Sequence, residues 1–360
     1  MRSCVSTALA VVGVITMVSG CTSSPAPTDE TNRTVTLVTH DSFATEGFEQ
    51  AASAATGYNV KVVTAGDGGE LSAQLVLTAG SPIADAFFGV DNVYASRLIE
   101  NDVTEPFTPG DSVPERAVTL SRQLTSADTQ QAQADALPMV AVDLGATCIN
   151  IDAQWFAERN LAEPVTFEDL TRDEYRDLTV LLDPTSSSTG ASFLIGTVAE
   201  FGDDGFAQYW SDLKDNGVRL EQSWTDAYNG QFTQGGGTGT FPIVLSYSSS
   251  PAWTLTDDGS RTTTKALLET CTTQVEYAGI LRGASNPEGA KAVVDYLLSR
   301  QFQDSIAESM YMYPVDEQAY LPEQWQQFAP LPTEPRDLSP KRISAGMTGW
   351  LQQWSEATGW

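Results

Sequence analysis

The sequence is poor in positive charge and in histidine. Its 360 residues include 19 lysines and arginines against 47 aspartates and glutamates, which gives a net charge of −28. The basic residues form no cluster, so we expect no nucleic-acid partner. His40 is the single histidine, which excludes a zinc site built on several histidines, and no metal site is expected. A Ser–His–Asp triad would need His40, and the sequence has no GxSxG elbow. We therefore expect neither an enzyme with catalytic residues nor a cofactor.

Cysteine is scarce as well, with 4 in the chain. Cys4 and Cys21 lie in the amino-terminal segment, which leaves Cys148 and Cys271 in the body of the protein. Two cysteines in an exported domain most often form a disulfide, and we expect one here. The alternative is a reactive thiol, which needs surroundings that lower its pKa. Neither a CxxC spacing nor a basic neighbour provides them.

The chain also lacks an apolar run long enough to cross a membrane. Residues 1–20 combine Arg2 with a short apolar run, which is typical of a signal peptide. The letters VSGC that end at Cys21 resemble a bacterial lipobox, so we expect Cys21 to be the lipidated first residue of the mature chain. The alternative is an ordinary cleaved signal peptide. Residues 21–33 are rich in Ser, Thr and Pro and predict a flexible tether. The expected location is extracytoplasmic, with a lipid on Cys21 anchoring the protein to the cell membrane.

Strands and helices alternate in the part of the chain that follows. Segments at 34–39, 59–65 and 85–90 predict strands, and segments at 48–56, 70–78 and 92–100 predict helices. This order predicts an α/β fold in which a parallel sheet carries helices on both faces. The length of 360 residues suits about two domains. A long apolar run at 137–151 is therefore expected to cross from one lobe to the other.

Aromatic residues and hydroxyls come together at residues 223–253. Trp224 begins a short predicted helix, and residues 243–247 form an apolar, β-branched run that predicts a buried strand. Three serines, 248–250, follow at the carboxyl end of this strand, where open α/β sheets bind ligands. A flat cation would stack on Trp224 and Tyr247. Asp41 or Asp67 would supply the opposite charge.

A second candidate site is DPTSSSTG at residues 183–190, directly before a predicted helix at 191–201. Hydroxyls and free backbone N–H groups at a helix start can bind an anionic or hydroxyl group. Simple capping of the helix explains this segment equally well. The lysine of a P-loop is missing, which argues against nucleotide hydrolysis.

Seven segments occur in an order that carries a resemblance: HDSFA at 40, ADAFFGVDN at 84, DPTSSSTG at 183, SWTDAY at 223, VLSYSSSPA at 244, QVEYAGIL at 274 and MYMYPV at 310. Over residues 35–327 the chain resembles the thiamine-binding periplasmic proteins of ABC importers. The resemblance implies a two-lobed type II periplasmic binding protein fold with mixed, mostly parallel sheets and a ligand cleft between the lobes. Residues 34–142 plus 276–318 would form lobe 1, and residues 143–275 plus 319–360 would form lobe 2.

The resemblance also implies the roles of individual residues. The implied ligand-binding set is His40, Asp41, Asp67, Ser186, Ser187, Trp224, Tyr247, Ser249, Ser250 and Tyr311. Ser186 and Ser187 would receive the phosphate or hydroxyethyl end of the ligand. His40 stands where a tyrosine is usual in the family, and Tyr311 where a tryptophan occurs. Thr185 stands where an arginine can occur, which weighs against the phosphorylated forms of thiamine. The expected disulfide would lie near the hinge and limit the motion of the lobes.

The expected function is capture of thiamine, with thiamine phosphates as further candidates, by a monomeric lipoprotein that delivers it to an ABC transporter permease. One alternative keeps the scaffold and changes the ligand to another organic cation, such as a polyamine or a thiamine-related pyrimidine. The other is a thiamine-degrading enzyme of this fold. That enzyme would use Cys148 or Cys271 as its nucleophile, so the cysteine would have to be free and in the cleft.

Overall fold

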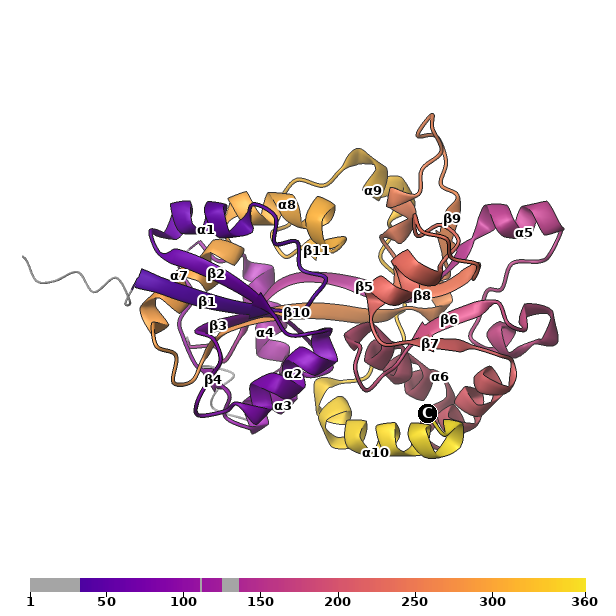
Figure 1. Cartoon of the computed structure of the whole chain (residues 1–360), viewed down its shortest axis with the longest axis horizontal. Coiled ribbons are helices and arrows are strands. Elements are labelled where there is room, and N and C mark those ends of the chain that lie inside the picture. The colour runs from indigo at the N-terminus through magenta and orange to yellow at the C-terminus, as the bar shows by residue number, and fades with distance from the viewer. Residues whose placement is uncertain (1–32, 111, 125–135) are drawn as a thin grey trace, which may run out of the picture.

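The computed structural model describes residues 33–110, 112–124 and 136–360. The expected signal peptide, most of the tether and Cys21 lie outside these residues. The described chain forms an 11-stranded mixed sheet in which the main order of strands is β2-β1-β3-β10-β5-β8-β6-β7. Figure 1 shows the two long strands β5 (Val140–Asp152) and β10 (Thr272–Leu281) running through the middle of the molecule, between its two halves.

The first half has the expected alternation of strands and helices. Its strands are β1 (Thr34–Thr39), β2 (Asn59–Thr64), β3 (Ala86–Asp91) and the short β4 (Thr104–Glu105), and its helices are α1 (Phe48–Thr56), α2 (Gly68–Leu77), α3 (Ala95–Glu100) and α4 (Glu115–Leu124). β1 pairs in parallel with both β2 and β3. Helices cover both faces of this part of the sheet, with α1 on one side and α2 and α3 on the other (Figure 1). The α/β class predicted from the sequence is confirmed.

Most of the long apolar run at 137–151 lies in β5, and all residues of β5 are buried. β5 pairs antiparallel with β10 on one side and with β8 (Ile243–Tyr247) on the other. β10 also pairs antiparallel with β3. The parallel ladders therefore lie in the two halves, and the antiparallel pairs involve the two long strands that connect them.

The second half repeats the α/β pattern. It contains β6 (Thr179–Leu182), β7 (Arg219–Glu221), β8, β9 (Thr264–Ala266), α5 (Ala153–Arg159) and α6 (Ser188–Asp215), with short 3₁₀ turns at Glu168–Thr171, Asp173–Tyr175, Ser250–Trp253 and Leu268–Thr270 and a π-helical segment at Thr225–Gln231. α6 is kinked at Gly202, where φ is 72° and ψ is 174°. This left-handed backbone favours glycine. It divides α6 into two helices, and the first of them corresponds to the helix predicted at 191–201.

The carboxyl-terminal part of the chain packs on both halves. It comprises α7 (Pro287–Leu297), α8 (Arg300–Met310), β11 (Tyr313–Pro314), α9 (Glu323–Phe328) and α10 (Pro340–Thr358). α10 lies along α6 in Figure 1, and the rings of Trp354 and Trp210 meet at 5.8 Å between centroids. Trp350 is buried too and donates a hydrogen bond to Asp203 at 2.8 Å. Trp350 and Trp354 thus form the packing stripe that their helical spacing favours.

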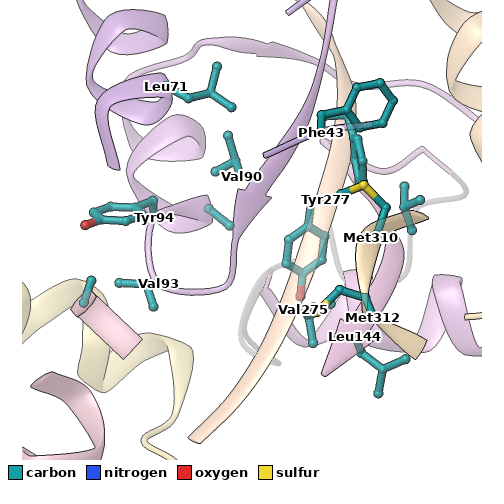
Figure 2. Packing of buried hydrophobic residues seen from close by; sticks show 14 of the residues in the cluster. Phe43, Leu71, Val90, Val93, Tyr94, Leu144, Val275, Tyr277, Met310 and Met312 are labelled. Atoms are coloured by element: carbon teal, nitrogen blue, oxygen red, sulfur yellow. The ribbon is translucent and has the colours of Figure 1, made fainter. Parts of the chain in front are cut away.

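The apolar core continues beneath the two long strands. Figure 2 shows Leu144 of β5, Tyr277 of β10 and Val90 of β3 among its members, together with Met310 at the end of α8. Among the described residues, no helix combines the length and the apolar character that a bilayer crossing requires.

Cys148 and Cys271 form the expected disulfide, across 123 positions of sequence and with their Cα atoms 4.2 Å apart. Cys148 lies in β5, and Cys271 directly precedes β10. Their neighbours Thr147 and Thr272 are paired in the antiparallel ladder. The bond therefore ties the two long strands to each other on the side of the second half.

Candidate functional site

The carboxyl ends of strands from both halves point toward the middle of the molecule. In the first half, β1 leads to His40, β2 to Asp67, and β3 ends at Asp91. In the second half, β6 leads into residues 183–187 and β7 leads to Trp224. Ligands of open α/β sheets bind beyond such strand ends. The two sets of strand ends meet in this structure.

Asp67 makes the principal contact between them. Its Oδ1 accepts hydrogen bonds from the backbone N–H groups of Gly68 at 2.6 Å and Ser188 at 2.9 Å. Its Oδ2 accepts one from the backbone N–H of Trp224 at 3.3 Å. Burial raises the pKa of Asp67, although these N–H groups and His40 act in the opposite direction. The carboxylate expected to face the ligand is here a bridge between the starts of α2 and α6 and the backbone of Trp224.

Two glycines allow this close approach. A Cβ on Gly69 would lie 2.4 Å from the backbone oxygen of Ser186, and a Cβ on Gly68 would lie 2.6 Å from Cβ of Ser188. Real Cβ atoms do not come this close to other heavy atoms. Nearby, the Tyr94 hydroxyl donates to the backbone oxygen of Pro184 at 3.1 Å. The start of α2 therefore docks directly on the hydroxyl-rich loop that precedes α6.

An aromatic cavity of about 220 Å³ lies beside this contact. Its lining residues are Trp224, Tyr228, Asn229, Gln234, Gly235, Gly236, Ser250, Trp253, Thr254 and Tyr311. Trp224 stacks on Tyr228 at 4.9 Å between ring centroids and an interplanar angle of 11°. Its indole N–H donates to the Ser246 hydroxyl at 2.9 Å, which fixes the orientation of the ring. The volume is below the range of about 300 to 1,000 Å³ usual for ligand pockets. It suits a flat group rather than a bulky one.

Tyr311 closes another side of this cavity. It follows α8 with a left-handed backbone, φ 59°, an uncommon conformation for a residue other than glycine. Its ring lies 6.1 Å from Trp224 and 5.0 Å from Trp253, with an edge-on angle of 84° to the latter. The Ser249 hydroxyl donates to the backbone oxygen of Tyr311. This bond joins the segment after α8 to the end of β8.

Tyr247 was expected to stack with the ligand, and it lies next to the cavity without lining it. Its ring is half-buried and 6.2 Å from that of Trp224. Burial raises the pKa of Tyr247 well above its usual range, and Glu276 and Asp67 add to the shift. Hydrogen bonds with Gln274 and Thr189 act in the opposite direction. The phenol thus lies near the ring of Trp224 and within the influence of the carboxyls of Glu276 and Asp67.

The hydroxyl loop already uses its side chains within the protein. Ser186 donates to the backbone oxygen of Gln222 at 2.9 Å, and Ser187 accepts from the Gly190 N–H at 3.4 Å as the N-cap of α6. Ser187 thus has the capping role that one of the two interpretations of this segment predicts. Asp41 is exposed, whereas His40 is buried. Neither lines the aromatic cavity.

Three acids lie side by side across neighbouring strands. Glu276 on β10 is paired with Asp91 on β3 and, on its other side, with Asp143 on β5. All three are buried, and Nε2 of His40 lies 3.7 Å from Oε2 of Glu276. We refer to Asp91, Glu276 and Asp143 as the acidic row. Among residues 33–110, 112–124 and 136–360, no group of three or more His, Cys, Asp or Glu side chains could hold a metal ion.

The charges in the acidic row are strongly perturbed. Burial, with a further contribution from Glu276, raises the pKa of Asp91 to about 7. The same two causes raise that of Asp143 well above its usual range. Burial alone would lower the pKa of His40, but Glu276 and, less strongly, Asp67 and Asp41 outweigh it, so the net shift is upward. Asp91 and Asp143 therefore keep their protons to a higher pH than ordinary aspartates do.

Some functional candidates were missed from the sequence. Tyr228 lies four residues after Trp224 in the segment SWTDAY, and this helical spacing was a usable signal for stacking. Trp253 is the last residue of the aromatic and hydroxyl-rich stretch at 223–253. For the acidic row, the signal was a carboxylate within an otherwise apolar strand, as at Glu276 in QVEYAGIL. Buried acids of this kind are rare unless they are partnered or functional.

An α/β fold in which the strand ends of two halves meet, next to a small aromatic cavity, is the fold of the type II periplasmic binding proteins. The chain belongs to the bacterial extracellular solute-binding protein family, whose sequence profile matches residues 81–333. The recognition made from the ordered sequence segments is confirmed, and so is the fold class.

Individual relatives agree with this assignment. The thiamine-binding periplasmic protein of Salmonella typhimurium (strain LT2) is 25% identical over 329 residues, which cover 90% of this chain and 93% of that protein. A solved structure of a periplasmic thiamin binding protein superposes with a TM-score of 0.74 at 23% identity, covering 90% of this chain and 96% of the other. The protein AfuA from Actinobacillus pleuropneumoniae, with fructose-6-phosphate bound, gives a TM-score of 0.70 at 16% identity, with coverages of 91% and 99%. Similar folds therefore accompany different ligands.

Proposed function

We propose that this protein captures thiamine outside the cytoplasm and presents it to the permease of an ABC importer. The observation that carries the proposal is the aromatic cavity around Trp224, whose backbone N–H donates to Asp67 of the first half. Stacked rings favour a flat, positively charged ligand, with each cation–π contact contributing about 0.5 to 2 kcal/mol depending on desolvation. The relative from Salmonella typhimurium carries thiamine binding in its name. Its alignment with this chain spans nearly the full length of both.

Capture proceeds by closure of two lobes, residues 34–142 plus 276–318 and residues 143–275 plus 319–360. The support for this division is that β5 and β10 run between the halves, as hinge strands would (Figure 1). The contacts of Asp67 with Ser188 and Trp224 join the proposed lobes and would break on opening. The ligand enters while they are apart and stacks on Trp224. The closed form is then the one that the permease recognises.

The preferred ligand is thiamine rather than its phosphates. A phosphate would seek the free N–H groups at the start of α6. Oδ1 of Asp67 already accepts a hydrogen bond from the Ser188 N–H there, at 2.9 Å, and the Ser187 hydroxyl accepts one from the Gly190 N–H. A phosphate at this point would have to displace a carboxylate or stand against its negative charge. This arrangement agrees with the expectation, based on Thr185, that phosphorylated forms of thiamine bind less well.

The alternative with an enzymatic cysteine loses its support. Cys148 and Cys271 are joined to each other, so neither has the thiolate that nucleophilic catalysis requires. The other alternative, in which the ligand is a different organic cation, is supported by the same aromatic cavity. Competition binding against thiamine distinguishes the two. Lipidation at Cys21 and a monomeric state complete the proposal. Mass spectrometry of the membrane fraction and light scattering test these two points.

Isothermal titration of the purified mature protein with thiamine tests the proposal directly. We expect saturable heat and quenching of tryptophan fluorescence at micromolar ligand, because Trp224 lines the cavity. Thiamine monophosphate, a polyamine and the thiamine pyrimidine are then offered as competitors. Absence of both heat and quenching with thiamine would reject the assignment. Stronger binding of a competitor would replace thiamine by that compound.

A further inference from the structure

The acidic row contains more hydrogen-bond acceptors than donors. Oδ2 of Asp91, both carboxyl oxygens of Asp143 and Oε2 of Glu276 find no hydrogen-bond donor among the described residues. The same is true of Oε1 of Gln274, whose side chain is fully buried. Its amide group donates to Oε1 of Glu276 at 3.3 Å. Buried acceptors without donors are costly, so this group requires protons or a bound cation.

The surroundings of the row supply little positive charge. His40 faces Glu276 across 3.7 Å, is 7% exposed, and its Nε2 has no hydrogen-bond partner in the described part of the chain. Asp67 and Asp41 face His40 and add negative charge. The phenols Tyr94 and Tyr277 lie near Asp91, and Tyr247 lies near Glu276. One imidazolium cannot balance three carboxylates. At least one carboxyl must therefore hold a proton when no cation is near.

The row is connected to the candidate site. Gln274, two residues before Glu276, donates to the Ser188 hydroxyl at 3.4 Å. The backbone N–H of Ser188 in turn donates a hydrogen bond to Asp67. Tyr247 lies near both groups. Glu276 contributes to its raised pKa, and its ring lies 6.2 Å from that of Trp224. Glu276 of the row is therefore joined to the backbone of Trp224 by a chain of hydrogen bonds through Gln274, Ser188 and Asp67. The effective dielectric of a buried site is low, so a cation on Trp224 interacts with the carboxyls of the row more strongly than it would in water.

We infer that the acidic row is the counter-charge for the cationic centre of the ligand, and that binding a permanently charged ligand releases a proton from the row. The inference rests on the proposed capture of a cation. It adds the group that selects the ligand for its charge. It also adds a consequence, because the proton must leave when the cation arrives. The proton passes from a carboxyl of the row to solvent while the lobes are apart, and no covalent bond to the ligand forms or breaks.

Titration calorimetry in two buffers with different ionisation enthalpies measures proton release. Thiamine is titrated at pH 6.5 and at pH 8 in each buffer. We expect about 0.5 to 1 proton released per thiamine at pH 6.5, fewer at pH 8, and an affinity that rises by up to about tenfold per pH unit between them. The same titration of thiamine without protein corrects for protons exchanged by the ligand itself.

Two variants locate the source of the proton. Asp143→Asn leaves two carboxyls in the row, so proton release should fall by at least half. Glu276→Gln removes the central acid and should weaken thiamine binding about tenfold or more. Glu269→Gln, at an exposed position, is the matched control and should change neither quantity. The wild-type measurement does not depend on how well the variants fold.

The outcomes separate the inference from the proposed function. Thiamine binding with the same heat in both buffers and no pH dependence would overturn proton release while leaving capture of thiamine intact. Proton release that survives Asp143→Asn and Glu276→Gln unchanged would place its source outside the row and also overturn the inference. Absence of any thiamine binding would overturn both.

Discussion

The two sides of the candidate site contain different types of side chain. On the second half, aromatic rings and hydroxyls lie in the segments that follow β7 and β8, and Trp224 lines an open cavity. On the first half and the long strands, carboxyls lie within the sheet itself, fully or almost fully buried. The rings belong to connecting segments, where binding residues are often found. Carboxyls held in strand register cannot move separately from the sheet. Under the proposed function, the aromatic rings recognise the shape of the ligand and the buried carboxyls recognise its charge.

The largest effect is expected from the strands that join the two sides. Replacing both cysteines, Cys148→Ser with Cys271→Ser, removes a bond across 123 positions. Loss of a cross-link over a loop of this length should lower the free energy of unfolding by about 4 kcal/mol. Urea denaturation of the double variant and the wild type measures the difference. A change below about 0.5 kcal/mol would mean that packing of β5 against β10 is sufficient alone.

The acidic side should make stability depend on pH. The folded protein keeps Asp91 protonated up to a pKa of about 7, whereas an unfolded chain ionises aspartate near pH 4. The folded state thus binds more protons between these values, and stability falls as pH rises through this window. His40, whose pKa is also raised, acts in the same direction. Its contribution is present below its ordinary pKa and is lost as pH rises through the raised one.

Asp91→Asn should therefore flatten the curve of stability against pH. The expected loss of stability between pH 4 and pH 7 in the wild type is on the order of 3 kcal/mol. Urea melts of the ligand-free protein at pH 4, 5, 6 and 7 measure it. The matched control is Asp258→Asn, because hydrogen bonds from Thr256 and Ser260 lower the pKa of this exposed aspartate to about 2. A wild type whose stability rises over this pH range would contradict the assignment of protons to the row.

The aromatic side should affect the ligand more than the fold. Trp224→Ala removes the ring that stacks on Tyr228, and we expect thiamine binding to weaken by about 3 kcal/mol or less. Titration calorimetry gives the change. Tyr320→Ala is the control, because this aromatic side chain is exposed and lies outside the cavity lining. Near-wild-type affinity of the Trp224 variant would place the pocket elsewhere.

The smallest effect concerns the contact between the two sides. Gly69→Ala would place a Cβ 2.4 Å from the backbone oxygen of Ser186, so the start of α2 must move away. We expect a loss of about 1 to 2 kcal/mol in stability from this overlap, with weaker thiamine binding because closure is hindered. Thermal melts and calorimetry report the two quantities. Gly349→Ala, in α10 with open space around its Cβ, is the control. Equal behaviour of the two variants would show that the contact is not required.

Much of the first half could be predicted because its signals are local. The strand at Thr34–Thr39 and the helix at Phe48–Thr56 were predicted with the bounds that the structure has. β-branched alternation and the left-handed Gly57, φ 76°, mark these elements within a few residues. The helix at Thr225–Gln231 was predicted too, although its π-helical form was not. The candidate site was predicted in part, since Trp224, Ser250 and Tyr311 do line one cavity.

The sequence by itself determined the succession of strands and helices, the pairing of the two remaining cysteines and the family, because each depends on neighbouring residues, on a count or on ordered segments. The tertiary structure decided the partners of Asp67 and the existence of the acidic row. Asp91 and Glu276 are far apart in the chain and become neighbours when β3 pairs with β10. No local pattern reports such a pairing, because register between distant strands is fixed by the packing of the whole sheet.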